Sequence, residues 1–311
     1  MNIREYQLLW FCRKVKRKLT GKGLHYTRYA GKELLDLQTA NDWMAERISE
    51  NQPFMAGRFG STELGSTWVF DLPSGPSQKT QERIVWEMKN NSGFFPQKAD
   101  MVEKFARLLE NACGNVDMLG VWFNPMEDYM AEHYAPQCQL THLTALEPWY
   151  VEHPWTRALK GKKVLVIHPF VETMKKQYEN RAKLFANPEI LPELEKLYTV
   201  KAVQTLAGED DNRFQTWFEA LDWMFEEAMK YDFDIAILGC GAYGFPLAAR
   251  IKEAGRQAVH LGGATQLLFG IKGKRWDTFP VINRLYNEYW VRPGDNEKPR
   301  GAEKVEEGCY W

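Results

Sequence analysis

The chain has 311 residues, enough to bury a substantial core as one large domain or two modest ones. Forty basic residues stand against 41 acidic ones, so nothing in the overall charge points to a nucleic-acid-binding protein. Five scattered cysteines lack disulfide or metal spacing, and no apolar run approaches the roughly 20 residues that span a bilayer. We therefore expect a soluble, cytoplasmic protein.

Residues 1–30 form a basic N-terminal segment. Leu8, Phe11, Val15 and Leu19 fall on one face of a helix predicted over residues 3–19. A basic amphipathic helix with aromatic residues is a candidate for the surface of an anionic membrane, which would make the protein peripheral on the inner face. The alternative is a solvated helix packed on its own domain by that stripe. The cations of the segment are Arg4, Arg13, Lys14, Lys16, Arg17, Lys18, Lys22 and Arg28.

Residues 31–150 form the N-terminal half of the main domain, which we predict over residues 31–291. The pattern predicts helices over 32–50, 78–90 and 98–112, and strands over 54–57 and 116–123. In the loop after residue 57, Ser61 or Thr62 can cap the next helix. The stretch 124–150 carries three prolines and many aromatic residues, and we expect it to be irregular.

Residues 151–291 form a regular C-terminal half, followed by a polar tail over 292–311 that we expect to be loose. The predicted elements are strands at 164–167, 198–206 and 235–238, and helices at 172–186 and 213–230. A helix and a strand ending at His260 complete a βαβ unit. This alternation predicts an α/β fold: a doubly wound, mostly parallel sheet with helices on both faces and an N-terminal helical extension.

The turn after the strand at 235–238 is rich in glycine. Gly239, Gly241 and Gly244 have the G-x-G-x-x-G spacing, and their backbone N–H groups with the following helix N-terminus favour an anion. Such a turn predicts a nucleotide site. A dinucleotide site needs an acidic residue at the end of the next strand, where this chain has His260. Close packing of helix and strand is the alternative role of the glycines.

The cysteine of the same turn offers another chemistry. Cys240 occupies the tight turn after a strand, where hydrolases place a nucleophile, and His168 or His260 can be its partner. The flanking residues do not match the G-x-S-x-G elbow, and a buried cysteine is usually a small apolar filler.

Three further segments are candidates for ligand contacts. In residues 58–63, Arg58 suits a diphosphate and Glu63 suits a hydroxyl or a hard metal, unless the two simply form an ion pair at a helix N-terminus. The loop 270–276 carries Lys272, Lys274 and Arg275 together with two glycines, and it is either a phosphate loop or a solvated basic turn. Glu147 lies among aromatic residues, as in a sugar-binding cleft or in ordinary core.

These segments in this order resemble the GT-D-type glycosyltransferases, bacterial enzymes with a Rossmann-like fold. Residues 58–63, reading Arg-Phe-Gly-Ser-Thr-Glu, are similar to the family's first motif, whose Asp-x-Glu helps hold a nucleotide diphosphate and a divalent metal. Residues 237–248, continued at 255–258 and 261–262, look like its second. The chain departs from the family at Ser61, which stands at the first acidic position, so only Glu63 carries over. It also departs at His260, where an acid is expected, and at Gly263.

The resemblance implies a glycosyltransferase that moves a sugar from a nucleotide sugar, with UDP as the expected nucleotide, to a glycan or lipid-linked acceptor. The setting it implies is the synthesis of bacterial surface polysaccharide or glycoprotein. Manganese or magnesium is the implied cofactor, held through Glu63. The catalytic candidates are Glu63, Glu147, His168 and His260, and the base among the last three stays open. The donor-binding candidates are Arg58, Gly60, Ser61, Glu63, Gly239, Gly241, Tyr243, Gly244, Gly262, Gly263, Lys272 and Arg275.

Two rival functions fit the same residues. A Rossmann-type NAD-dependent oxidoreductase or epimerase acting on a nucleotide sugar shares the glycine turn but lacks the acid for the ribose. A non-catalytic nucleotide- or glycan-binding partner of an assembly complex is suggested by Ser61 in place of the acid. Under each reading no nucleic acid is expected, and a homo-oligomer is compatible with the sequence.

Overall fold

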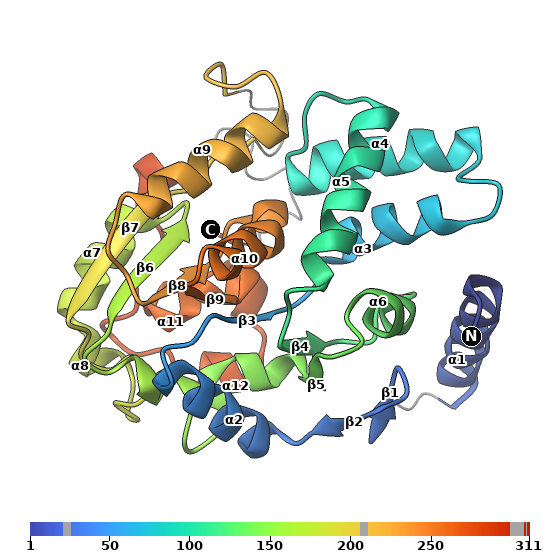
Figure 1. Ribbon diagram of the computed structural model, residues 1–311. Coiled ribbons are helices and arrows are strands. Elements are labelled where there is room, and N and C mark those ends of the chain that lie inside the picture. The colour runs from blue at the N-terminus through green and yellow to red at the C-terminus, as the bar shows by residue number, and fades with distance from the viewer. Residues whose placement is uncertain (21–25, 206–210, 299–307, 309) are drawn as a thin grey trace.

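The structure is a computed structural model that describes residues 1–20, 26–205, 211–298, 308 and 310–311. The described strands form one nine-stranded sheet (Figure 1). Its first two strands pair antiparallel, and all the other pairings are parallel. In spatial order the strands are β1 (Arg28–Tyr29), β2 (Lys32–Leu35), β5 (Gln139–His142), β4 (Met118–Val121), β3 (Phe54–Gly57), β9 (Gln257–His260), β8 (Ile235–Leu238), β6 (Lys163–His168) and β7 (Lys196–Lys201).

Helices cover both faces of this sheet, which confirms the predicted doubly wound α/β fold (Figure 1). Successive strand residues alternate between the two layers, as the pleat requires: Met55 packs in one core cluster and Ala56 in the other. One face carries α3 (Ser61–Thr67), α4 (Gln78–Ser92), α5 (Ala99–Cys113), α6 (Glu127–Tyr134), α9 (Trp217–Met229) and α10 (Gly244–Glu253). The other carries α2 (Leu37–Ser49), α7 (Val171–Glu179), α8 (Arg181–Leu184), α11 (Thr265–Leu268) and α12 (Pro280–Asn283).

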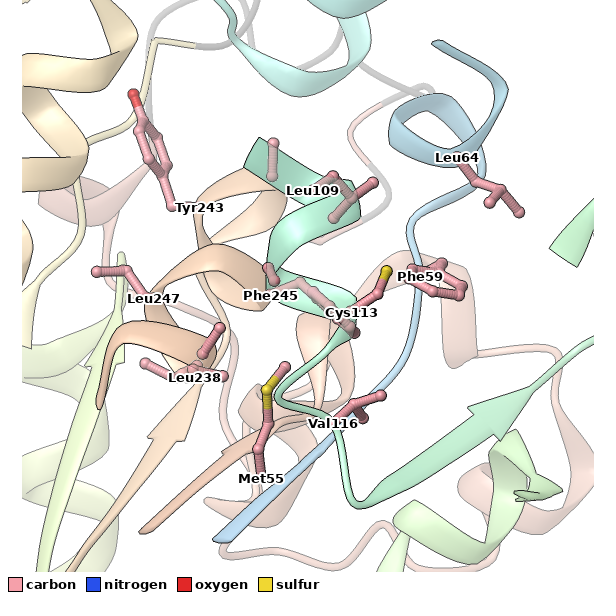
Figure 2. Packing of buried hydrophobic residues seen from close by; sticks show 14 of the residues in the cluster. Met55, Phe59, Leu64, Leu109, Cys113, Val116, Leu238, Tyr243, Phe245 and Leu247 are labelled. Carbon is pink, nitrogen blue, oxygen red and sulfur yellow. The ribbon is translucent and has the colours of Figure 1, made fainter. Parts of the chain in front are cut away.

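The core between the sheet and helices α5 and α10 fixes the loops that follow β3 and β8. Val102, Phe105 and Leu109 recur at helical spacing along α5 and are buried. Figure 2 shows side chains of this cluster from the strands and the helices gathered in one layer. In it Phe59, just after β3, packs on Phe245 of α10 with ring centroids 5.0 Å apart. This contact joins residues 58–63, the first predicted motif, to residues 237–248, the second.

Several predicted elements have different bounds in the structure. The helix expected over 32–50 begins only at Leu37, because β2 takes Lys32–Leu35 into the sheet edge. The helix expected over 172–186 is broken into α7 and α8. The stretch 124–150 is not irregular throughout, since it contains α6 and β5. The strand expected over 198–206 is Lys196–Lys201, and residue 206 lies outside the described residues.

The two predicted halves share one sheet, because β3 of the first pairs with β9 of the second. The described parts of the tail are anchored rather than loose. Glu297 is buried, and its carboxylate accepts hydrogen bonds from the backbone N–H groups of Glu172 and Thr173 at the start of α7. The N-terminal helix α1 (Ile3–Thr20) lies at the edge of the molecule (Figure 1). Within the described residues no helix is long and apolar enough to cross a membrane.

Candidate functional site

A cavity of about 610 Å³ opens at the carboxyl ends of the central strands β3, β9, β8 and β6. The helices after β3 and β8 leave to one face of the sheet, and those after β9 and β6 leave to the other. Crevices at such reversals are where open α/β sheets bind ligands. The predicted site residues that line the cavity are Arg58, Gly60, Ser61, Glu63, Glu147, His168, Gly239, Gly241, Tyr243, His260, Gly262, Gly263 and Arg275.

Two glycine turns form one side of the cavity, and each contains a residue with positive φ. Gly241 follows β8 with φ of 59°, and Gly262 follows β9 with φ of 62°. Each of them comes after a residue with negative φ, Cys240 and Leu261. An αR residue followed by one with positive φ, as at Leu261 and Gly262, can turn neighbouring N–H groups toward one point and form a concave anion site. Gly262 and Gly263, which were also predicted as donor-binding residues, lie in the second of these turns, after the neighbouring strand β9.

The Arg58 guanidinium lies against the second of these turns. A Cβ atom added to Gly262 would be only 2.4 Å from its Nη2, so the turn has to be glycine for the guanidinium to lie there. Arg58 Nη1 donates to the carbonyl of Phe59 at 3.1 Å, and the guanidinium carbon is 5.4 Å from the Trp122 ring centre. Among the described residues Arg58 forms no ion pair with Glu63. Arg58 is thus a cation held beside the Gly262 turn in the lining of the cavity, and a guanidinium there suits an anion.

Glu63 occupies the first turn of α3, whose N-cap is Gly60 and not Ser61 or Thr62 as predicted. A Cβ on Gly60 would be 1.8 Å from Glu63 Oε2, so the carboxylate folds over the helix N-terminus, where the helix dipole favours it. Its Oε1 accepts a hydrogen bond from Ser92 Oγ at 2.8 Å. Among the described residues no group of three metal-ligating side chains exists. One carboxylate is not by itself a site for a divalent ion, so these residues do not fit a tightly held metal.

Glu147 is a carboxylate of the cavity whose pKa is strongly shifted. Burial raises the pKa of its side chain to about 7, and the positive charge of Arg58 opposes that rise. The residue follows β5 and a short helical turn, Leu143–Leu146. A carboxyl with a pKa near neutral can hold or release a proton at physiological pH, which is the property of a general base.

The two histidines of the cavity are buried and neutral. Burial lowers the pKa of His168 to about 3, and burial together with Arg58 lowers the pKa of His260 to about 3. His168 Nδ1 accepts the Phe170 N–H at 3.0 Å, so the neutral ring carries its proton on Nε2. His260 Nδ1 is 3.3 Å from the carbonyl of Leu238 and donates to it in the matching tautomer. Both are weaker bases than Glu147, which is therefore the strongest of the three base candidates.

Cys240 is buried, and burial raises the pKa of its thiol well above the ordinary value. A thiol in this state stays protonated and is a poor nucleophile. The cysteine therefore fits the role of apolar filler in the turn.

Two predicted donor-binding residues do not line the cavity. Lys272 lies outside it, with Nζ 5.1 Å from the ring centre of Tyr286. Gly244 is buried in the first turn of α10, where a Cβ would be 2.1 Å from His260 Nδ1. This glycine makes room for the histidine, which is the packing role that the sequence left open.

Gly244 gives a stability prediction. We expect Gly244→Ala to lower the free energy of unfolding by about 1–3 kcal/mol, because overpacking against His260 outweighs the roughly 1 kcal/mol that alanine gains in a helix. Gly65→Ala, in α3 with nothing within 4 Å of the added Cβ, is the matched control and should be neutral or stabilising. Urea unfolding of both variants measures this. Equal effects of the two substitutions would refute the close approach at Gly244.

Other residues complete the cavity without having been predicted. Trp122 donates from Nε1 to the Phe59 carbonyl at 3.1 Å and forms a wall next to Arg58. Tyr310 packs its ring on Trp276, and its hydroxyl oxygen accepts a hydrogen bond from Arg275 Nη1 at 3.1 Å. Trp311 packs against Phe170 with ring centroids 5.9 Å apart. The signal for Trp122 was its position directly after a buried strand, and the tail residues gave none.

Comparison with known proteins adds little to this site. No family model and no curated protein matches the chain. Among solved structures, one described as the selenomethionine-substituted structure of domain of unknown function 1792 aligns with a TM-score of 0.42 and 12% identity. The alignment covers 76% of this chain and 79% of that chain. A similarity at this level carries no argument about function, so the function must be inferred from the residues of the cavity.

Proposed function

We propose that the chain is a glycosyltransferase that uses a nucleoside diphosphate sugar, with UDP as the first nucleotide to test. One observation carries the proposal: the same cavity joins two glycine turns and an arginine with a carboxyl group whose pKa lies near 7. The first set suits a diphosphate, and the carboxyl suits deprotonation of a hydroxyl group. The cavity volume of about 610 Å³ is in the range of small-molecule sites.

The diphosphate binds, in this proposal, between the turns at Gly241 and Gly262 and the Arg58 guanidinium. The backbone N–H groups and the cation are both fixed before binding, so little reorganisation accompanies the leaving group's gain of charge. Glu63, which lines the cavity, accepts hydrogen bonds from hydroxyls of the donor. Trp122, Trp276 and Tyr310 offer flat apolar faces on which the base and sugar rings stack.

Transfer proceeds by attack of an acceptor hydroxyl on the anomeric carbon. The acceptor oxygen forms a bond to that carbon while the bond from the carbon to the diphosphate oxygen breaks. Glu147 takes the hydroxyl proton, and the nucleoside diphosphate leaves with the electron pair, stabilised by Arg58 and the turn amides. The cavity positions both partners, which removes most of the entropic part of the barrier.

The pKa of Glu147 sets a pH dependence. A base must be ionised, so kcat/KM should rise with pH through about 7 and level off above it. Initial rates of nucleotide release between pH 5.5 and 8.5 measure this profile. A flat profile over that range would exclude Glu147 as the base.

The oxidoreductase alternative has less support. The end of β9 presents His260, buried and neutral, where a dinucleotide site needs a carboxylate for the ribose hydroxyls. The third glycine of its fingerprint, Gly244, is taken up by contact with that histidine. The alternative of a non-catalytic binding partner predicts nucleotide binding without turnover.

Turnover of sugar nucleotides tests the proposed function. The full chain is incubated with UDP-glucose, UDP-galactose, UDP-N-acetylglucosamine and GDP-mannose, with and without manganese, and free UDP or GDP is measured. We expect slow release with at least one donor, since many transferases leak slowly to water. NAD reduction or sugar epimerisation without nucleotide release would favour the oxidoreductase or epimerase. Tight nucleotide binding with no turnover, even with membranes added as acceptor, would favour the binding partner.

A further inference from the structure

The N-terminal helix presents its apolar stripe to solvent. Leu8, Phe11, Val15 and Leu19 are 64%, 57%, 40% and 81% exposed. They lie along one face of α1, since they recur at three- and four-residue intervals. The sequence alone left open whether this stripe packs on the domain, and the structure shows that it does not.

A different face of α1 holds the helix on the domain. Ile3 and Tyr6 are buried, Tyr6 donates from its hydroxyl to Glu132 of α6, and Arg13 pairs with the buried Asp128 of the same helix. The Tyr6 ring also packs edge-on to Tyr129, with centroids 5.6 Å apart. Polar and aromatic contacts hold this inner face of α1 on α6. The exposed stripe lies on a different face of the helix.

Cations flank the exposed stripe. At 100° per residue, Arg4 falls within its angular range and Lys14 and Lys18 fall beside it, and all three are exposed. Only one acidic residue, Glu5, lies in the helix. An apolar strip bordered by basic side chains matches an interface whose interior is hydrocarbon and whose surface is anionic.

The same helix borders a groove that leads toward the cavity. The groove has a volume of about 640 Å³ and runs between α1 and helices α3 and α4. Trp10 and Phe11 form its α1 side, so that Phe11 belongs both to the stripe and to the groove. Ser61, Thr62 and Asn91 border both the groove and the cavity. A membrane that contacts the stripe at Phe11 would therefore also lie beside the groove.

We propose that α1 docks the protein on an anionic lipid bilayer through the stripe Leu8-Phe11-Val15-Leu19. The groove beside α1 then opens at the bilayer surface and admits a lipid-linked acceptor to the cavity. The second statement rests on the proposed function, whereas the first stands on the stripe and its cations alone.

Cosedimentation with vesicles tests the docking. The full chain is mixed with vesicles of phosphatidylcholine containing 30% phosphatidylglycerol, and with vesicles of phosphatidylcholine alone. We expect binding to the anionic vesicles that weakens with added salt. The double variant Leu8→Gln/Leu19→Gln keeps residues of good helix propensity and should bind at least tenfold more weakly. Trp86→Gln removes an equally exposed apolar residue (58%) from α4 and should bind as the natural chain does.

The charges supply a second arm of the test. Lys14→Gln and Lys18→Gln should each weaken binding to the anionic vesicles about fivefold, because each cation near such a surface contributes about 1 kcal/mol. Equal binding of the stripe variant and of the natural chain to the anionic vesicles would overturn the docking. So would a natural chain that is dimeric without lipid and becomes monomeric in the stripe variant, because the stripe would then join two copies of the chain.

Activity separates this proposal from the proposed function. In the stripe variant, sugar transfer from a labelled donor into solvent-extractable lipid of native membranes should fall in parallel with vesicle binding, while hydrolysis of the donor in free solution should not change. Label found only in protein or in soluble glycan would overturn the lipid-linked acceptor. Stripe-dependent vesicle binding without any turnover would leave the docking in place and contradict the transferase.

Discussion

Arg58→Ala should raise the dissociation constant for UDP at least 100-fold and lower kcat/KM for the sugar donor by at least as much. Charge-assisted hydrogen bonds contribute about 1.5–3 kcal/mol each, and a guanidinium makes two of them to a diphosphate. Arg58 also faces the turn at Gly262, so its loss leaves one side of the proposed phosphate site without a cation. Isothermal titration with UDP and initial-rate kinetics measure the two effects.

The variant should also shift the pH profile. Arg58 holds the pKa of Glu147 below the value that burial alone would set, so its removal should move the limb near pH 7 to higher pH. A merely structural role of Arg58 would not produce this shift. Lys272→Ala is the matched control, because it removes the same charge from a residue that does not line the cavity, and we expect less than a threefold change. Equal losses in the two variants would contradict the site.

Glu147→Gln should lower kcat by about 10²–10⁴-fold and leave UDP affinity equal or somewhat higher. The amide keeps the size of the carboxyl but cannot take the acceptor proton, and general-base catalysis contributes about that much. UDP affinity should not fall, because the change removes a negative charge from a cavity that binds an anion. Steady-state kinetics with titration of UDP separates the two quantities.

Glu63→Gln serves as the comparison for Glu147→Gln. Glu63 accepts a hydrogen bond from Ser92 in the lining of the cavity, so its amide should mainly weaken donor binding and should leave the limb near pH 7 in place. If Glu147→Gln keeps the limb near pH 7 and a kcat within threefold of that of the natural enzyme, the base is another group. His168 or His260 would then return as candidates despite their low pKa values.

The sequence predicted the fold through its most local signals. The apolar run at 235–238, the glycines after it and the helix that follows describe a βαβ unit completely, and the structure contains it. Residues 32–35 show why other bounds were wrong. Their two leucines fit a helix as well as a strand, and only pairing of β2 with β5, more than 100 residues away in the chain, decides between them.

Local signals also predicted several residues that line the cavity. Arg58, Gly239 and Gly262 were predicted because each lies at the end of an apolar strand, where parallel sheets bring loops together. Lys272 was predicted by closeness in sequence and lies outside the cavity, because the chain turns away after α11 and the Lys272 N–H bonds to the Val291 carbonyl. Tyr310 and Trp311 were assigned to a loose tail because no periodicity marks a segment that is held by tertiary contacts alone.

The most direct test of the central claim is thermal unfolding of the natural chain and of Arg58→Ala with UDP, GDP, CMP or NAD, with and without manganese. A ligand at 100 times its dissociation constant stabilises by about 2.7 kcal/mol, which is a visible shift in melting temperature. We expect a shift with UDP or GDP in the natural chain and a much smaller one in the variant. A shift with NAD alone, or the same UDP shift in both proteins, would contradict a diphosphate site at Arg58 and the glycine turns.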